Sequence, residues 1–275
     1  MEKLSIFGGT GFIGKTFASK YSEKCNVIPR DENVPVDDNI VYFISTTNNY
    51  NVFTDVHLDI NTNLNKLMDV LPNVKGTINF ISSWFVYGSG YDSINHQASE
   101  TSSCNPKGFY SITKKTAEDL IISYCEVNSI DYRIIRLCNV IGGDANASSK
   151  KNAFEFLLRN IVNGEKIEIY TGDNYRNYLH VDDVVLAIDT IIKNGQLNTV
   201  YNVGSRCSDR LIDVIQYVKE KSNSNSEIKF VMAPRFHKIV QTTDFFMNCN
   251  RLFGLGFHQK YRTTEAIDRI LKLHP

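Results

Sequence analysis

Short apolar runs alternate with helical patterns along the first half of the chain. The runs fall at residues 4–7, 26–28, 40–44, 77–82 and 131–137, and most end at Gly, Ser, Pro or Cys. The apolar spacing in 12–21 and 113–125 predicts helices. Strands that alternate with helices indicate parallel β-α-β units, so we expect an α/β fold with a doubly wound parallel sheet. Ligands of such sheets bind at the carboxyl ends of the strands.

The pattern departs from this alternation in two places. Between the strands near Ile28 and Ile40 lie only eleven residues, which include Pro29 and Pro35. This interval is too short for a helix, a strand and a second helix, so we expect a loop. Beyond about residue 145 the alternation loosens. An amphipathic segment at 154–163, a short strand at 166–170 and the stretch 211–275 predict a smaller C-terminal α+β lobe.

The charges of the chain balance, with 30 Lys plus Arg and 30 Asp plus Glu in 275 residues. A balanced total favours neither nucleic acid nor an anionic membrane as the main partner. The sequence begins without the apolar run of a signal peptide, and no stretch approaches the ~20 apolar residues that span a bilayer. Six scattered cysteines, without Cys-x-x-Cys or metal-ligand spacing, predict reduced thiols and no metal site. We therefore expect a cytoplasmic protein.

A glycine-rich segment, 8–14, follows the first predicted strand directly. Gly8 and Gly11 permit a tight turn and a close backbone approach, and Gly14 lets the next helix pack against the sheet. The N-terminus of that helix offers free N–H groups and a positive dipole end to a pyrophosphate. The strand-loop-helix context predicts a Rossmann-type dinucleotide site. The residues expected to contact the cofactor there are Gly8, Gly11, Phe12, Ile13 and Gly14, together with Ser45 at the end of a later strand.

These observations predict two domains. Residues 1–150 are expected to form the dinucleotide-binding domain, to which residues 176–204 return. Residues 151–275 are expected to form the smaller lobe that binds the substrate.

The residues after the second predicted strand bear on the choice of dinucleotide. NAD-binding proteins usually place an acid there for the ribose 2′-hydroxyl, whereas an Arg favours the 2′-phosphate of NADP. Pro29 stands about where the acid is expected, and Arg30 follows it. We therefore favour NADP(H). The alternative is that Arg30 is a solvated loop charge and Asp31 holds NAD.

Tyr110 and Lys114 stand four residues apart, on one face of a predicted helix. A Tyr hydroxyl with an ordinary pKa of ~10 transfers protons poorly at neutral pH. A neighbouring ammonium group lowers that pKa by ~1–3 units, towards the range that acid–base catalysis needs. Upstream, Ser83 lies at the carboxyl end of a predicted strand, where its hydroxyl can bond the substrate oxygen whose proton Tyr110 handles. The spacing alone occurs by chance, but with Ser83 it predicts a proton-transfer site.

Six motifs occur in one order, at 8–14, 82–88, 110–114, 136–140, 176–183 and 201–204. Together they resemble the extended short-chain dehydrogenase/reductases, the NAD(P)-dependent epimerase/dehydratase group that acts on nucleotide sugars. The segment 250–256 resembles the closing segment of that family.

The resemblance implies a catalytic triad of Ser83, Tyr110 and Lys114, in which Lys114 also holds the nicotinamide ribose. It further implies that three residues, Asn139, Arg176 and Arg235, reach the nucleotide and diphosphate of the substrate. Arg suits this role because its planar guanidinium binds phosphate oxygens in pairs. A homodimer is also expected.

The chain departs from the family pattern beside Ser83. The 4,6-dehydratases of the family carry an Asp and a Glu at the positions of Trp84 and Phe85, and decarboxylases tend to carry a Glu at that of Phe85. Neither aromatic side chain transfers the protons that these reactions need. We therefore expect Trp84 and Phe85 to form an apolar surface beside the sugar, although large aromatic residues also commonly fill a core.

Two hydride-transfer reactions remain, and both use Ser83, Tyr110 and Lys114. One is the reduction of a nucleotide-linked 4-keto sugar by NADPH, with Tyr110 as the proton donor. The other is C4 epimerisation with tightly bound NAD. Arg30, the missing acid and the short chain favour the reductase. A third reading, an NADP-binding sensor without turnover, is weakened because such proteins commonly lose the Tyr or the Lys.

Overall fold

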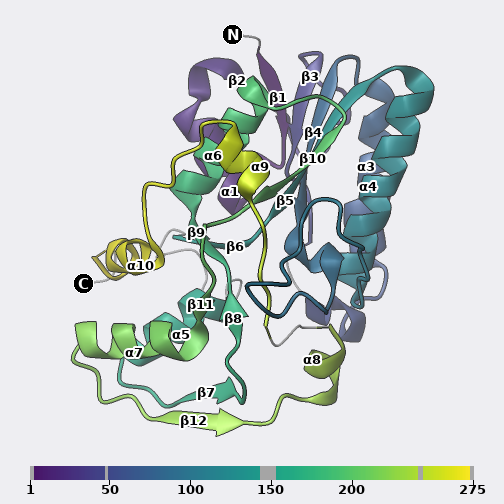
Figure 1. Cartoon of the computed structure of the whole chain (residues 1–275). Helices are drawn as coiled ribbons and strands as arrows, with labels where there is room; N and C mark the ends of the chain where they lie inside the picture. Colours follow the sequence, from purple (N-terminus) through teal and green to yellow (C-terminus); the bar gives the residue numbers. More distant parts are fainter. Residues whose placement is uncertain (1–2, 47–48, 143–152, 241–243, 273–275) are drawn as a thin grey trace.

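A six-stranded parallel sheet is the largest element of the chain (Figure 1). The computed structural model describes residues 3–46, 49–142, 153–240 and 244–272. The strand order is β10-β5-β4-β3-β1-β2, and every pairing is parallel. The strands are β1 (Leu4–Phe7), β2 (Cys25–Val27), β3 (Asn39–Tyr42), β4 (Thr77–Ser83), β5 (Asp131–Leu137) and β10 (Thr199–Val203). The order reverses beside β1, so the predicted doubly wound sheet is confirmed.

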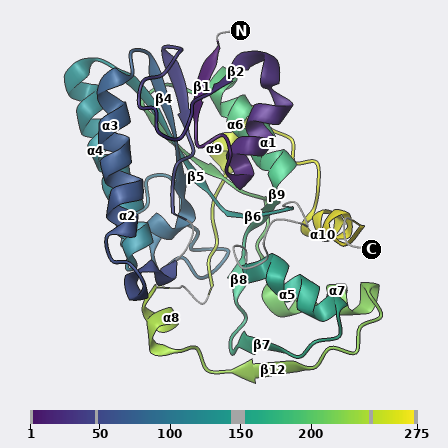
Figure 2. The same cartoon turned by 180° about the vertical axis from the view of Figure 1, so that it is seen from behind.

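Helices cover both faces of this sheet (Figures 1 and 2). On one face lie α1 (Phe12–Lys20) and α6 (Val181–Asn194), and on the other α3 (Lys66–Val70) and α4 (Phe109–Asn128). Neighbouring strand residues enter opposite cores: Val41 packs on the α1/α6 side, whereas Ile40 packs on the α3/α4 side. Strands that are buried on both faces read as continuous apolar runs, which explains why they were visible in the sequence.

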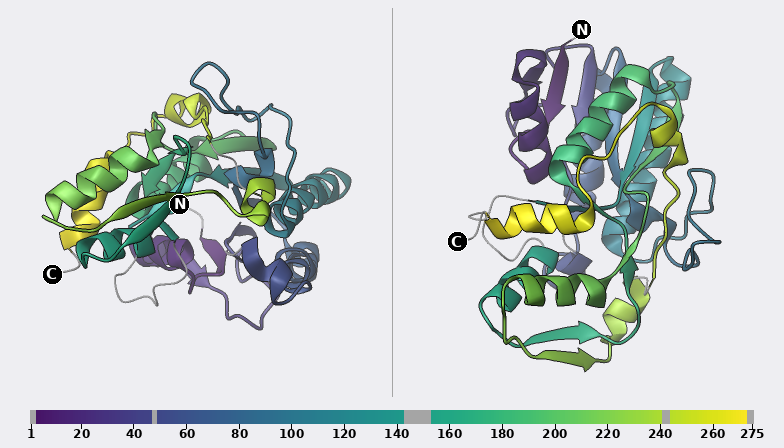
Figure 3. Two further views of the ribbon diagram at one scale, coloured as in Figure 1. Left: turned by 90° about the horizontal axis from the view of Figure 1, so that it is seen from below. Right: turned by 60° about the vertical axis from the view of Figure 1, so that its left-hand side comes forward.

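A third apolar core lies beyond the carboxyl ends of the sheet strands (Figure 3). It is formed by α5 (Ala153–Val162), β7 (Ile167–Tyr170), α7 (Leu211–Lys221), β12 (Ile228–Val231) and α10 (Thr263–Lys272). Strands β7 and β12 pair in parallel, with Ile167 opposite Ile228. The predicted smaller α+β lobe is therefore present.

Short pairings connect the two parts. Strand β6 (Asn139–Ile141) pairs with β9 (Tyr178–His180), and β8 (Tyr175–Arg176) pairs with β11 (Asp209–Arg210). The chain then returns to the large sheet, because α9 (Asn250–Gly254) packs on β10 and the side chains of Phe245 and Leu252 enter its core. The predicted boundary at 150/151 lies outside the described residues, and the two-domain division stays a prediction.

Local hydrogen bonds explain two boundaries. Residues 29–38 form neither helix nor strand, as predicted, and Asp37 ties this loop to the sheet by accepting from Ser5 Oγ at 2.9 Å. Helix α4 begins four residues before the predicted 113–125 and ends three residues later. Its N-cap is Gly108, whose N–H donates to Ser111 Oγ at 3.0 Å. The earlier start places Tyr110 in the first helical turn, which apolar spacing does not mark.

Candidate active site

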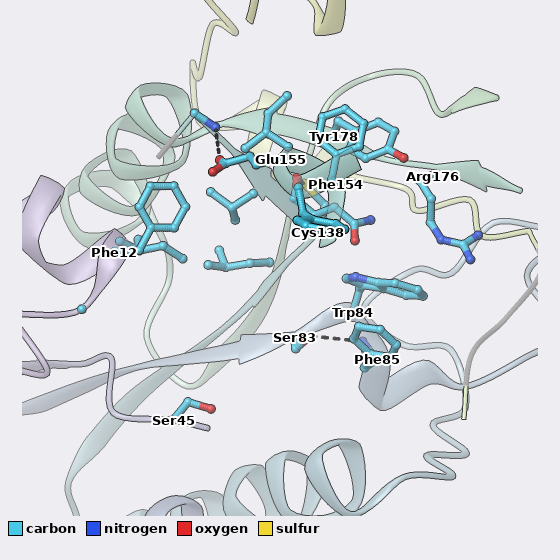
Figure 4. Close-up of a pocket in the computed structure, with 18 of the residues that line it drawn as sticks. Phe12, Ser45, Ser83, Trp84, Phe85, Cys138, Phe154, Glu155, Arg176 and Tyr178 are labelled. Carbon is cyan, nitrogen blue, oxygen red and sulfur yellow. Dashed lines mark hydrogen bonds between the residues drawn. The ribbon is translucent and has the colours of Figure 1, made fainter. Parts of the chain in front are cut away.

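A large cleft lies between the sheet and the smaller lobe (Figure 4). Its volume is about 2430 Å³, well above the ~300–1,000 Å³ of a typical pocket for one small molecule. Its lining comes from the glycine-rich loop, the ends of β3 and β4, the start of α4, and α5, β7 and β9. The cleft therefore has room for a dinucleotide and a second ligand together.

The glycine-rich loop has the geometry that a pyrophosphate needs. Gly8 adopts a φ of +80°, and a Cβ on it would lie 2.9 Å from the backbone nitrogen of Ile44. A Cβ on Gly14 would lie 2.3 Å from the carbonyl oxygen of Gly8. Helix α1 has no side-chain N-cap and no acid in its first turn, so its first N–H groups remain available to an anion. The predicted cofactor-contacting residues of this loop, Gly8, Gly11, Phe12, Ile13 and Gly14, all line the cleft.

Arg30 and Ser45 also line the cleft. Arg30 is exposed and follows β2, the strand next to β1. Asp31 is not among the lining residues. The side chain beside the cleft at this edge is therefore a cation rather than an acid, and the preference for NADP over NAD stays a prediction.

The first prediction concerns this cation. We expect Arg30→Ala to weaken NADPH binding by about 10- to 100-fold, the worth of a charge-assisted hydrogen bond of ~1.5–3 kcal/mol, and to leave NADH binding unchanged. Calorimetric titration with both cofactors measures this. Asp31→Ala is the matched control and should change neither affinity. Equal affinities in the native chain, or a preference for NADH that survives the substitution, would contradict the assignment.

The three predicted catalytic residues come together at one place. Ser83 ends β4, and Tyr110 and Lys114 occupy successive turns of α4. The hydroxyls of Ser83 and Ser45 hydrogen-bond to that of Tyr110. Burial raises the pKa of Tyr110, these two hydrogen bonds act in the opposite direction, and the charge of Asp59 adds to the rise. From the sequence, Lys114 was expected to lower this pKa. That expectation is wrong for this structure, because desolvation of the phenolate dominates.

Lys114 is buried, with only 1% of its surface exposed. Its Nζ donates to the carbonyl oxygen of Ile81 at 2.6 Å and lies 4.0 Å from the centre of the Phe80 ring. Burial lowers the pKa of Lys114 to about 7, and the charge of Glu118 opposes the fall. An ammonium has three N–H donors. Lys114 therefore has donors to spare for the ribose hydroxyls that the family resemblance assigns to it.

Trp84 and Phe85 form one aromatic surface beside Ser83 (Figure 4). Their rings stack at 4.1 Å in 3₁₀-helix η5 (Trp84–Tyr87), which follows β4 directly. Phe85 meets the ring of Tyr110 edge-on, with centroids 6.1 Å apart. Trp84 is buried against Phe245 at 4.4 Å, and both rings also line the cleft. The pair therefore fills core and faces the site at once.

The predicted substrate residues separate into two groups. Asn139 lines the cleft, and its Nδ2 donates to the carbonyl oxygen of Asn177 at 3.1 Å. Arg176 lines it too, with its guanidinium 5.8 Å from the Trp84 ring, and burial lowers its pKa (Figure 4). Arg235 is exposed at the start of α8 (Arg235–Val240) and is not among the lining residues. The structure thus brings Asn139 and Arg176 to the site but not Arg235.

Several residues that line the cleft were not predicted from the sequence. His237 faces the cleft two residues after Arg235, and its Nε2 hydrogen-bonds to the hydroxyl of Tyr50. Glu155 and Arg159 line it from α5, where the amphipathic pattern predicted a helix without assigning its polar face. No short motif marks these side chains, because the chain brings them together only through its tertiary fold.

Neither a metal cluster nor a membrane span is found in the described part of the chain. No three His, Cys, Asp or Glu side chains within them gather as a metal would require. Nor does any helix of the described part combine the length and the apolar character of a membrane span. The cytoplasmic location and the homodimer stay predictions.

Solved structures share this fold over nearly the whole chain. The UDP-glucose 4-epimerase of Thermotoga maritima superposes with a TM-score of 0.86 at 18% identity, covering 98% of each chain. RMD from Pseudomonas aeruginosa, solved with NADPH, gives 0.84 at 20% identity and covers 99% of this chain and 98% of its own. DesIV, the dTDP-glucose 4,6-dehydratase of Streptomyces venezuelae, gives 0.85 at 16% identity and covers 99% and 96%. At such identities the likeness establishes the fold alone.

Sequence comparison gives related enzymes and a family. The dTDP-D-glucose 4,6-dehydratase of Dictyostelium discoideum is 34% identical over 148 residues, which are 50% of this chain and 33% of that protein. A trifunctional enzyme of Arabidopsis thaliana is 29% identical over 181 residues, 65% of this chain and 26% of its own. The chain thus matches a third or less of the length of these two relatives. The model of the NAD dependent epimerase/dehydratase family matches residues 40–204, more than half of the chain. The chain belongs to the NAD dependent epimerase/dehydratase family.

Proposed function

We propose that this protein reduces a nucleotide-linked 4-keto sugar, with NADPH as the hydride donor and Tyr110 as the proton donor. The observation that carries the proposal is the stacked pair Trp84 and Phe85, which occupies the place beside Ser83 and Tyr110 where the family's dehydratases carry two acids. Neither the indole of Trp84 nor the phenyl ring of Phe85 transfers a proton to or from the sugar at neutral pH. Hydride transfer with a single proton donor is the chemistry that remains.

The acids of the cleft already have partners. Within the described residues the acidic side chains of the lining are Glu155, Glu168, Asp182 and Asp183. Glu155 accepts from the N–H of Gly142 at 3.1 Å, and Asp183 accepts from two backbone N–H groups at 2.9 and 3.0 Å. Glu168 pairs with Lys229 and Asp182 with Arg269, at 3.1 and 3.3 Å. Tyr110 is thus the acid best placed to protonate the sugar.

The residues of the chain divide the work as follows. Ser83 offers its hydroxyl to the carbonyl oxygen of the sugar, and Tyr110 transfers its proton to that oxygen as negative charge develops there. The raised pKa of Tyr110 keeps the proton on the phenol, as a reductase requires. Lys114 directs its spare N–H donors at the nicotinamide ribose, and Arg176 and Asn139 hold the nucleotide part of the substrate. When bound, NADPH supplies the hydride.

The relatives are compatible with this assignment. The printed name of the Arabidopsis thaliana protein includes a UDP-4-keto-L-rhamnose reductase beside a dehydratase and an epimerase. RMD from Pseudomonas aeruginosa was solved with NADPH. The first supports a reaction on a nucleotide sugar, and the second supports a nicotinamide cofactor.

The test is incubation of the purified protein with candidate nucleotide sugars. With a nucleotide 4-keto-6-deoxyhexose and NADPH, we expect cofactor oxidation and a product heavier by two hydrogens in mass spectrometry. Interconversion of C4 epimers with no net cofactor change would replace the reductase by the epimerase. Binding of NADPH without any turnover across the panel would favour the sensor.

A second prediction concerns water loss. With nucleotide hexoses such as UDP-glucose and dTDP-glucose, we expect no product lighter by one water, because neither Trp84 nor Phe85 can donate or accept the proton that dehydration needs. Mass spectrometry of the nucleotide-sugar pool measures this. Water loss at an enzymatic rate would show that other side chains supply the acid and the base.

A further inference from the structure

Beneath the catalytic residues lies a buried set of charged and polar side chains that the mechanism above does not use. Helix α4 lies along the face of the sheet over β4 and β5 (Figure 1). From it, the carboxylate of Glu118 meets Arg136 of β5 and Ser82 of β4; we call these three residues the Glu118 network. Their exposed fractions are 1% for Glu118 and 4% for each of the other two.

The network is tightly bonded. Arg136 donates to the two carboxylate oxygens of Glu118 at 3.0 and 2.7 Å, and Ser82 Oγ donates to one of them at 2.5 Å. The guanidinium also stacks 4.8 Å from the ring centre of Tyr87. Paired guanidinium–carboxylate bonds fix direction as well as distance. Glu118 thus joins the helix that carries Tyr110 and Lys114 to the two central strands.

Lys114 lies one helical turn before Glu118, and both side chains are buried. Within the described residues Lys114 takes part in no ion pair. Its ammonium group donates a hydrogen bond to the carbonyl oxygen of Ile81. A buried ammonium with no opposite charge nearby tends to lose its proton. Glu118 is the nearest source of such a charge on its own helix, and it raises the pKa of Lys114 against the effect of burial.

We propose that Glu118 is a positioning residue of this active site, which ties α4 to β4 and β5 and places a negative charge one helical turn from the buried Lys114. Arg136 sets the strength of the effect, because it neutralises part of the carboxylate's charge. The proposal holds for ketone reduction and for C4 epimerisation alike, since both use Lys114.

The surroundings of Lys114 contain few other titratable groups. On α4 they are Tyr110 and Glu118, and β5 contributes Arg136. The charge of Asp59, from α2 (Leu58–Ile60), reaches Tyr110. Two further groups, Tyr87 and Cys104, face Arg136. Among these, Glu118 is the one group whose charge affects the pKa of Lys114.

The experiment follows the Lys114 side chain itself, by NMR of protein labelled with ¹³C at lysine Cε. The resonance that titrates near pH 7 is assigned by its loss in Lys114→Met. We expect Glu118→Gln to shift its titration to lower pH by about one unit, and Arg136→Met to shift it to higher pH, because the carboxylate then has no other cation. The alkaline limb of the turnover profile should move in the same two directions.

A matched control lies on the same helix. Lys115 and Asp119 form an exposed pair with the same spacing, and Asp119→Asn should leave the Lys114 titration where it is. If Glu118→Gln alone does not fold, the charge-balanced double variant Glu118→Gln/Arg136→Met replaces it and should give a smaller shift in the same downward direction. An unchanged titration, or shifts of one sign in both single variants, would overturn the proposal. Because the NMR readout needs no substrate, it stands apart from the fate of the proposed reaction.

Discussion

Tyr110→Phe should lower turnover by about 10²–10⁴-fold while cofactor affinity changes little. The substitution removes only the hydroxyl, which hydrogen-bonds to Ser83 and Ser45. The ring keeps its edge-on contact with Phe85, so the aromatic surface should persist. Stopped-flow measurement of NADPH oxidation, with fluorescence titration of NADPH in parallel, gives both quantities.

Ser45→Ala serves as the comparison for this variant. It removes one of the two hydroxyls that lower the pKa of Tyr110, so its effect should be small and should appear as a shift of the pH profile to higher pH. Turnover near the native rate in Tyr110→Phe would remove Tyr110 as the proton donor and with it the proposed mechanism.

The strands of the large sheet could be predicted from the sequence because each central strand is buried on both faces. Residues such as Ile40, Val41 and Tyr42 are all apolar for this reason, and a continuous run of this kind between loop signals is visible without any structure. The path of residues 244–257 was less accessible. Phe245 and Leu252 enter the core beside β10 through contacts between segments about fifty residues apart, which no local pattern records.

The site shows the same division. Gly8 and Gly14 could be assigned from spacing, because their steric constraint lies within a single strand-loop-helix unit. Spacing also paired Tyr110 with Lys114, but not the direction of the tyrosine's pKa, which depends on burial beneath distant segments. The prediction that Arg235 reaches the substrate site was wrong for a related reason. A motif position fixes the order along the chain, whereas the direction of a side chain on a short helix depends on how that helix packs.

Lys114→Met should abolish most turnover and yet stabilise the protein at pH 7. Folding holds the pKa of this amine at about 7, against 10.5 for an ordinary lysine. At ~1.4 kcal/mol per unit, keeping it protonated costs the fold up to about 5 kcal/mol. Met has a similar length and needs no hydration. Allowing for the lost bond to the Ile81 carbonyl, we expect a gain of about 1–3 kcal/mol in the free energy of unfolding.

The pH dependence separates this effect from ordinary repacking. Between pH 7 and 10.5 the unfolded chain binds this proton and the folded chain does not, so the stability of the native protein should rise with pH through that window. Lys114→Met lacks the rise, and its advantage should shrink as the pH increases towards 10. Urea unfolding from pH 6 to 10 measures the difference in the free energy of unfolding between the native protein and Lys114→Met. Lys115→Met, on the exposed side of α4, is the control. A difference that stays constant with pH, or a variant that is less stable at every pH, would mean that burial of the Lys114 amine does not destabilise its protonated form.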